Sequence, residues 1–132
     1  MMKKLILILC FCVSSLANAN GSEGTVAATE WLGLIDKGEY GESWVKADTF
    51  FRSQLSQEKW EQALVGVRAP LGTVISRKEL SNTEYSELPG APDGEYIVIQ
   101  FQTSFQNKKS SVETLTLSKS SGQWQAVGYF IK

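Results

Sequence analysis

Histidine is absent from this 132-residue chain, and its absence excludes several kinds of active site. Histidine is the usual general base near neutral pH and the commonest metal ligand. A Ser-His-Asp triad is therefore excluded. The sequence also lacks a glycine-rich phosphate loop and the closely spaced oxygen ligands of a calcium loop. We expect neither a metal nor another cofactor.

Cysteine is almost as scarce, because the chain contains only Cys10 and Cys12. Both lie in an N-terminal stretch that we expect to be removed. The remaining chain, residues 20–132, would then contain no thiol. Disulfide scaffolds, thiolate zinc sites and cysteine nucleophiles are excluded for such a domain.

The first 19 residues have the pattern of a secretory signal peptide. Two lysines near the start precede an apolar run over residues 5–13, which is far shorter than the ~20 residues of a membrane-spanning helix. Residues 17–19, Ala-Asn-Ala, form a small-x-small cleavage site. We predict cleavage between Ala19 and Asn20 and a periplasmic or secreted product with no membrane span. An uncleaved anchor is the alternative.

Strongly basic stretches are also lacking. The whole chain has 13 basic and 14 acidic residues, and loss of the two signal lysines leaves 11 basic residues and a net charge of −3. Nucleic acids and anionic membrane surfaces are bound by concentrated positive charge. We therefore expect neither as a partner.

Helical periodicity is present in the first half of the predicted mature chain. Apolar side chains recur every three or four residues in three stretches, which predicts three helices. The first runs from Thr25 to Gly38, the second covers residues 40–51, and the third begins after Ser56 and ends at Pro70. Their apolar stripes are Ala28, Trp31, Leu32 and Ile35; Tyr40, Trp44, Ala47 and Phe51; and Trp60, Leu64 and Val67.

The second half changes to the alternating pattern of strands. We predict strands over Thr73–Glu79, Glu95–Phe105, Val112–Ser118 and Trp124–Ile131. Short turns join the last three, which favours an antiparallel meander. Helices followed by strands indicate an α+β fold. We expect residues 20–132 to form a single domain in which three N-terminal helices pack on a curved four-stranded antiparallel sheet.

Short motifs occur along nearly the whole predicted mature chain. They are Trp31-Leu32 with Asp36 and Gly38, Tyr40, Ser43-Trp44, Arg68 with Leu71-Gly72, Ser76-Arg77, Pro92-Asp93-Gly94-Glu95-Tyr96, Thr103, Phe105, Glu113, and Trp124 with Gly128-Tyr129-Phe130-Ile131. Their order and spacing resemble the domain of unknown function 4019 family. That resemblance implies a bacterial protein, often with an export signal, and no established activity. The helix-then-meander order is also similar to cystatin-like and nuclear-transport-factor-2-like folds, in which a curved sheet wraps around helices and can leave a pocket.

Glu113 is the most informative polar residue. In its predicted strand it shares a face with Leu115 and Leu117. If that face packs on the helices, the carboxylate is buried and needs a partner, for which Arg68 and Arg77 are candidates. One interpretation is a structural ion pair or a position at the wet rim of the sheet. The other is a pocket carboxylate that binds or protonates a ligand.

The four tryptophans have two interpretations. Trp31, Trp44 and Trp60 lie on helical apolar stripes, where core packing is the more frequent role and an aromatic binding surface is the alternative. Trp124 begins a strand with two fairly apolar faces. That strand is either covered on both sides or offers a patch to a partner chain.

The leading functional hypothesis is a non-catalytic binding module for a small apolar ligand or a protein partner. Its candidate binding residues are Glu113, Arg68, Arg77, Trp44 and Tyr129. The aromatic residues would supply apolar contacts and the charged ones the few polar contacts that a pocket needs.

Two alternatives remain open. One is an enzyme in which Glu113 or Asp48 acts as acid or base, with Tyr96 or Tyr129 as hydrogen-bond donor. The other is a homo-oligomer that assembles through the open face or edge of the sheet. Outside the enzyme hypothesis, Asp36 and Asp48 are expected to be solvated helix charges, because aspartate is rarely buried unpaired.

Overall fold

The computed structural model describes residues 19–132, with side chains from residue 23 onward. Of the predicted signal segment, residues 1–19, only Ala19 lies within this range, and it is followed by Asn20 across the predicted cleavage site. Over the described residues the elements are α1 (Ala19–Asp36), α2 (Tyr40–Val45), α3 (Thr49–Gln54), α4 (Gln57–Val67), the 3-10 helix η1 (Ala69–Leu71), β1 (Val74–Tyr85), β2 (Tyr96–Phe105), β3 (Lys108–Ser118) and β4 (Gln125–Ile131). This order is the predicted α+β arrangement of helices followed by strands.

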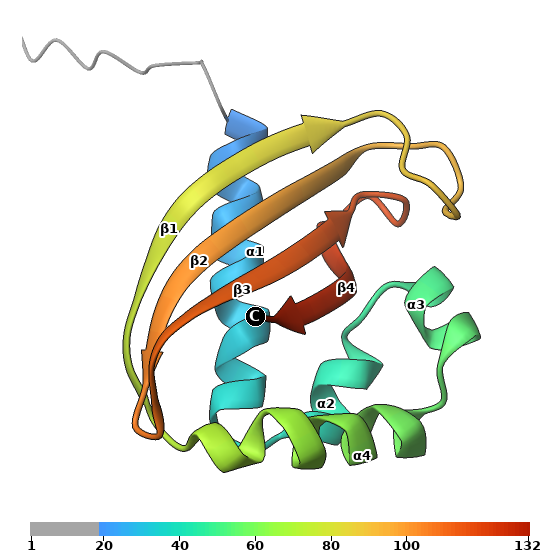
Figure 1. The fold of residues 1–132 in the computed structure, drawn as a ribbon. Coiled ribbons are helices and arrows are strands. Elements are labelled where there is room, and N and C mark those ends of the chain that lie inside the picture. Colours follow the sequence, from blue (N-terminus) through green and yellow to red (C-terminus); the bar gives the residue numbers. More distant parts are fainter. Residues whose placement is uncertain (1–18) are drawn as a thin grey trace, which may run out of the picture.

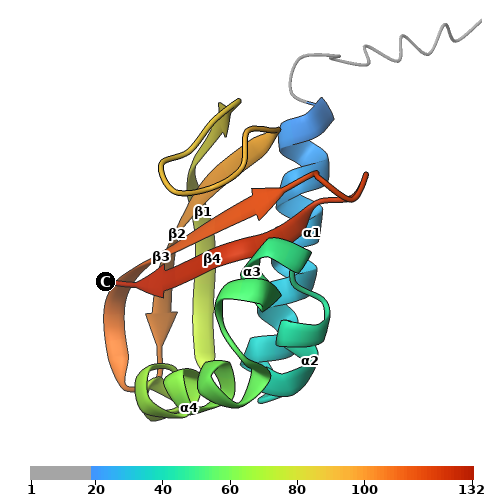
Figure 2. The ribbon, with the colours of Figure 1, turned by 90° about the vertical axis from the view of Figure 1, so that its right-hand side faces the viewer.

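The four strands form one antiparallel meander in the order β1-β2-β3-β4. Figure 1 shows that the sheet is strongly curved and that α1 runs across its concave side. Figure 2 shows α4 across one end of this assembly, with α2 and α3 beside β4 and α1. The sheet and the helices therefore share one core on the concave side.

The core follows the predicted periodicity. On β2, Ile97, Ile99 and Phe101 are buried while Gln100 is exposed, which confirms the alternating pattern. The helices contribute Ala28, Trp31, Leu32, Ile35, Trp60 and Leu64, and β3 and β4 contribute Leu115, Leu117 and Ala126. Gly24 lets α1 approach the sheet closely, since a Cβ there would lie 2.8 Å from Cδ1 of Ile97.

The prediction of three helices is wrong, because the stretch over residues 40–51 is divided into α2 and α3. Asp48 stands at the division. Its carboxylate caps α3 by accepting the Phe50 N–H at 2.8 Å, and its own N–H donates to the Ala126 carbonyl at 2.8 Å. A side-chain cap and a tertiary hydrogen bond thus override the continuous apolar stripe. Asp48 is only 2% exposed, so the expectation of a solvated charge is also wrong.

The first strand is longer than predicted. β1 continues to Tyr85, and its register with β2 shifts between Val74 and Ser76 and again between Glu79 and Ser81. Ile75 and Leu80 lie at these shifts and are 66% and 52% exposed. Each extra residue interrupts the alternation of inward and outward side chains. The alternating pattern therefore does not predict the second half of the strand.

Candidate functional site

Glu113 lies on β3 and is completely buried on the concave face. Its Oε1 accepts from Arg77 Nε at 2.8 Å and from the Thr103 hydroxyl at 2.5 Å. Its Oε2 accepts from Arg77 Nη2 at 3.3 Å and from the Tyr129 hydroxyl. The sheet register brings the donors together, because Arg77 is opposite Thr103 and Glu113 lies between Phe101 and Ile131. Both carboxylate oxygens are therefore fully engaged.

The same arginine also binds the end of α1. Arg77 Nη1 lies 2.8 Å from Asp36 Oδ2 and Nη2 lies 3.0 Å from Oδ1. Arg68, at the end of α4, donates to Asp36 Oδ1 at 3.3 Å and to the Gly72 carbonyl at 2.6 Å. We call Asp36, Arg68, Arg77 and Glu113 the ionic cluster. Its two positive and two negative charges balance, and they join α1, α4, β1 and β3. Asp36 is thus ion-paired rather than a free helix charge.

Burial and charge shift the pKa values of two residues here. Burial lowers the pKa of the Arg77 guanidinium, but its hydrogen bonds and charge interactions with Asp36 and Glu113 outweigh burial, so the pKa rises above its ordinary value. Burial is also the largest cause that raises the pKa of Tyr129, and the Glu113 carboxylate adds to it. Tyr129 therefore keeps its proton and Arg77 keeps its charge, which suits a permanent hydrogen-bond network.

Four of the five predicted binding residues meet here: Glu113, Arg68 and Arg77 belong to the ionic cluster, and Tyr129 donates to it. Arg68 joins them through Asp36 and lies over the Phe105 ring at 4.5 Å from its centroid. Trp44 does not join them. It lies on α2, where its Nε1 donates to the Leu55 carbonyl at 2.7 Å and the Arg52 guanidinium lies 5.8 Å from its ring centroid.

A second group of buried hydrogen bonds, around Ser43, joins the helices. Trp31 Nε1 donates to the Ser43 carbonyl at 2.8 Å, and Trp60 Nε1 donates to the Ser43 hydroxyl at 2.9 Å. The Ser43 hydroxyl in turn donates to the Tyr40 carbonyl at 2.6 Å. The Trp31 ring meets Tyr129 edge-on at 5.7 Å. Trp31 and Trp60 are 5% and 6% exposed, which confirms the expected core role for both.

Open space lies at the other end of the concave face, around Trp124. Trp124 lines three surface pockets whose walls are formed by described residues, of about 240, 380 and 290 Å³. Glu113 lines none of these three. The first pocket, which we call the Trp124 pocket, is lined by Glu84, Tyr85, Ser86, Glu95, Tyr96 and Trp124. The other two are formed with α1 and share Ala27, Glu30, Gln123 and Trp124.

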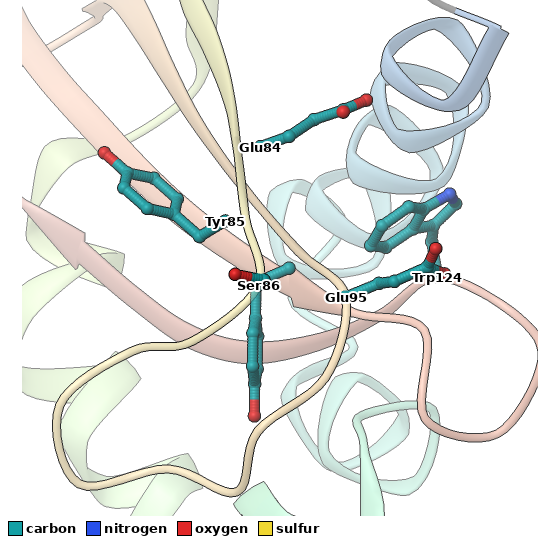
Figure 3. A pocket seen from close by; sticks show the side chains of 6 residues that line it. Glu84, Tyr85, Ser86, Glu95 and Trp124 are labelled. Atoms are coloured by element: carbon teal, nitrogen blue, oxygen red, sulfur yellow. The ribbon is translucent and has the colours of Figure 1, made fainter.

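The side chains of the Trp124 pocket come from the end of β1, the start of β2 and the residue before β4. Figure 3 shows Glu84 and Glu95 on the same side as Trp124, with Tyr85 directed away. Within the described side chains, neither carboxylate has an ion-pair partner. The Trp124 Nε1 is buried and finds no hydrogen-bond acceptor in this part of the chain. This end of the fold is therefore not satisfied by its own residues.

Sequence reasoning missed Glu84 and Glu95. The first lies beyond the predicted end of its strand, and the second follows a turn-rich segment that carried no functional signal. Trp124 was recognised only as an aromatic residue on an ambiguous strand. No short motif links the three residues, so the pocket depends on the length of β1.

The described residues contain neither a candidate membrane span nor a candidate metal site. Residues 19–132 contain no helix that is long and apolar enough to cross a membrane. The same part of the chain has no group of three or more histidine, cysteine, aspartate or glutamate residues placed to hold a metal ion.

Comparison with known proteins supports the family suggested by the motifs. A search of curated protein sequences finds no match. The model of the family described as protein of unknown function (DUF4019) matches residues 27–129, which spans α1 to β4. The chain therefore belongs to the DUF4019 family.

Proposed function

We propose that this protein is an exported, non-catalytic binding module whose ligand site lies around Trp124. One observation carries the proposal: a single tryptophan lines three pockets, and its indole N–H has no acceptor among the described residues. Ligand sites combine apolar walls with a few unsatisfied polar groups. Buried polar groups are normally paired. The other described exception is Arg68 Nε, whose guanidinium is already held through its Nη atoms by Asp36 and the Gly72 carbonyl and lines none of the three pockets.

The carboxylates of the enzyme hypothesis support a structural role instead. Both Glu113 oxygens accept hydrogen bonds from Arg77 and from a hydroxyl group. Asp48 accepts from the Phe50 N–H and, at 2.7 Å, from the Ser120 hydroxyl. A general acid or base must reach a substrate proton. These two groups are occupied by the protein itself, which favours binding over catalysis.

The finer fold assignment and the cellular location belong to the same proposal. The curved sheet around α1 favours a cystatin-like or nuclear-transport-factor-2-like arrangement (Figure 1). The lysines, short apolar run and Ala-Asn-Ala site favour export to the periplasm or beyond. Intact mass of the protein from the exported fraction tests this, and the expected chain begins at Asn20. A full-length mass would contradict cleavage.

The binding site is tested by native mass spectrometry on protein purified from the exported fraction. We expect a retained ligand on the wild-type chain and its loss from Trp124→Ala. The control is Phe130→Ala, because Phe130 is 56% exposed and lines none of the three pockets. Circular dichroism checks that both variants fold. Retention of the ligand by folded Trp124→Ala would place the site elsewhere.

A further inference from the structure

We propose that the Trp124 pocket binds an organic cation of the alkylammonium class. This inference rests on the proposed function for the location of the site alone. The ligand would be recognised by the carboxylates and rings of the pocket, since an ammonium group has no acceptor to offer the Trp124 indole N–H. The pocket combines two carboxylates, Glu84 and Glu95, with the aromatic residues Tyr96 and Trp124, and it contains no basic lining residue. Tyr85 also lines it, but its ring is directed away from Trp124 (Figure 3). The pocket lining therefore carries a formal charge of −2.

The charge of the pocket is unbalanced within the described structure. The β3–β4 connection contacts this end of the sheet through its backbone, because the Lys119 N–H donates to the Glu95 carbonyl at 3.1 Å. The Lys119 ammonium lies beside the Trp124 ring, but its ion-pair partner is Glu23, whose Oε2 is 3.8 Å away, and not Glu84 or Glu95. Glu84 and Glu95 are left without a counter-ion among residues 23–132. Both carboxylates belong to exposed residues that line the same pocket, and a bound cation would be attracted to both.

The aromatic residues add a second, independent preference for a cation. Ammonium groups are attracted to the faces of tryptophan and tyrosine rings, and protein sites for quaternary ammonium groups use such rings. Trp124 already shows this interaction, because the Lys119 ammonium lies 5.5 Å from its ring centroid. The Tyr96 hydroxyl is engaged with the Pro92 carbonyl, so Tyr96 offers its ring rather than a hydrogen-bonding group.

The size of the pocket limits the ligand. Its volume of about 240 Å³ lies below the ~300 Å³ at which drug-sized sites begin. A short aliphatic amine fits this description better than a large aromatic cation. We therefore expect a free amine whose ammonium group lies between the carboxylates and whose methylene chain contacts Trp124.

The test uses three probes with the same five-carbon chain: 1,5-diaminopentane, 1,5-pentanediol and glutarate. Each is titrated into the protein while the indole N–H signal of Trp124, assigned with Trp124→Phe, is followed by NMR. We expect saturable binding of the diamine only, weakened by added salt because the attraction is electrostatic. Equal or tighter binding of the diol or glutarate would overturn the cation assignment while leaving a Trp124 binding site in place. No response to any probe, with no ligand in the native mass spectrum, would overturn both proposals.

Variants of the two pocket carboxylates test whether their charges attract the ligand. Glu84→Gln and Glu95→Gln should each weaken diamine binding by roughly three- to tenfold. The control is Glu87→Gln, an exposed loop carboxylate that lies outside the pocket and should leave affinity unchanged. A further arm titrates Nα-acetyl-lysinamide, which separates a peptide lysine from a free amine as the source of the ammonium group. An equal loss from Glu87→Gln would show general charge attraction and contradict the site.

Discussion

The two ends of the concave face differ in how completely the protein satisfies its own charges. At the α4 end, Glu113 is 0% exposed and every oxygen of its carboxylate has a donor. At the other end, Glu84 and Glu95 line an open pocket and have no described counter-ion. The same sheet thus carries one group of charges that joins several elements and another that has no ion-pair partner among residues 23–132. If the proposed function is correct, the α4 end serves stability and the Trp124 end serves binding.

The register of β1 explains the difference. Near its start, Arg77 lies opposite Thr103 and reaches both the Glu113 carboxylate and the end of α1. Near its end, Glu84 lies opposite the buried Ile97, and no arginine or lysine stands beside it on β1 or β2. One strand therefore supplies the cation at one end and the unpaired anion at the other.

The strongest way to break the comparison is to remove the buried charge. Glu113→Gln should lower the free energy of unfolding by about 3 kcal/mol, because one partner of a buried ion pair is lost while Arg77 stays charged. Thermal melting measures the change. Glu42→Gln is the control, since Glu42 meets Lys46 at the surface at 4.0 Å and should lose under ~0.5 kcal/mol. Equal melting temperatures for the two variants would remove Glu113 from any structural role.

Alkaline pH should weaken the same end of the fold. Since the pKa of Tyr129 is raised in the folded protein, the native state holds that proton more tightly than the unfolded state. The resulting stability is complete below the unfolded value of about 10 and is lost as the pH rises above it, by up to about 1.4 kcal/mol per pH unit.

The measurement compares the stability of the wild type with that of Tyr129→Phe from pH 8 to pH 11. The two proteins are compared by the slope of their free energy of unfolding against pH. The absolute values differ for another reason, because the variant also loses the hydrogen bond to Glu113. Tyr96, whose pKa is raised by burial as well, remains in both proteins and contributes equally. Parallel curves would mean that Tyr129 titrates at its ordinary pKa.

A matched pair of tryptophan variants compares the two ends directly. Trp60→Phe removes the hydrogen bond to the Ser43 hydroxyl, whereas Trp124→Phe removes an indole N–H that has no described acceptor. The first should be less stable than the second by about 1 kcal/mol, the usual net value of one hydrogen bond. Urea unfolding measures both. A larger loss from Trp124→Phe would show that the Trp124 end is part of the rigid core.

The sequence predicts the α4 end of the molecule well. Alternation places Glu113 on the same face as Leu115 and Leu117, and the cost of burying a carboxylate points to an arginine partner. The observed contact with Arg77 fits that reasoning. Asp36 was missed as the bridge between the two arginines, because its position depends on where α1 ends against α4 and β1.

The pocket end was harder to predict for physical reasons. The two register shifts in β1 break its alternation, so the sequence pattern predicts a strand that ends before Glu84. The pocket also joins β1, β2 and the start of β4, and such contacts leave no local period in the sequence. The helix division at Asp48 was hidden in the same way, because the tie to Ala126 is a tertiary contact.

The smallest expected effect gives the sharpest distinction between the two ends. Glu84→Gln and Glu95→Gln should each change the free energy of unfolding by less than ~0.5 kcal/mol without ligand, since no described partner is lost. The double variant should be equal to or slightly more stable than the wild type at low salt, because two acidic charges are removed from a chain with a net negative charge. Thermal melting at two salt concentrations measures this. A loss above ~1 kcal/mol would reveal a structural partner for these carboxylates and would make the Trp124 end a second structural cluster. Carboxylates that can be removed without loss of stability, yet with loss of cation affinity, are the ones that serve binding.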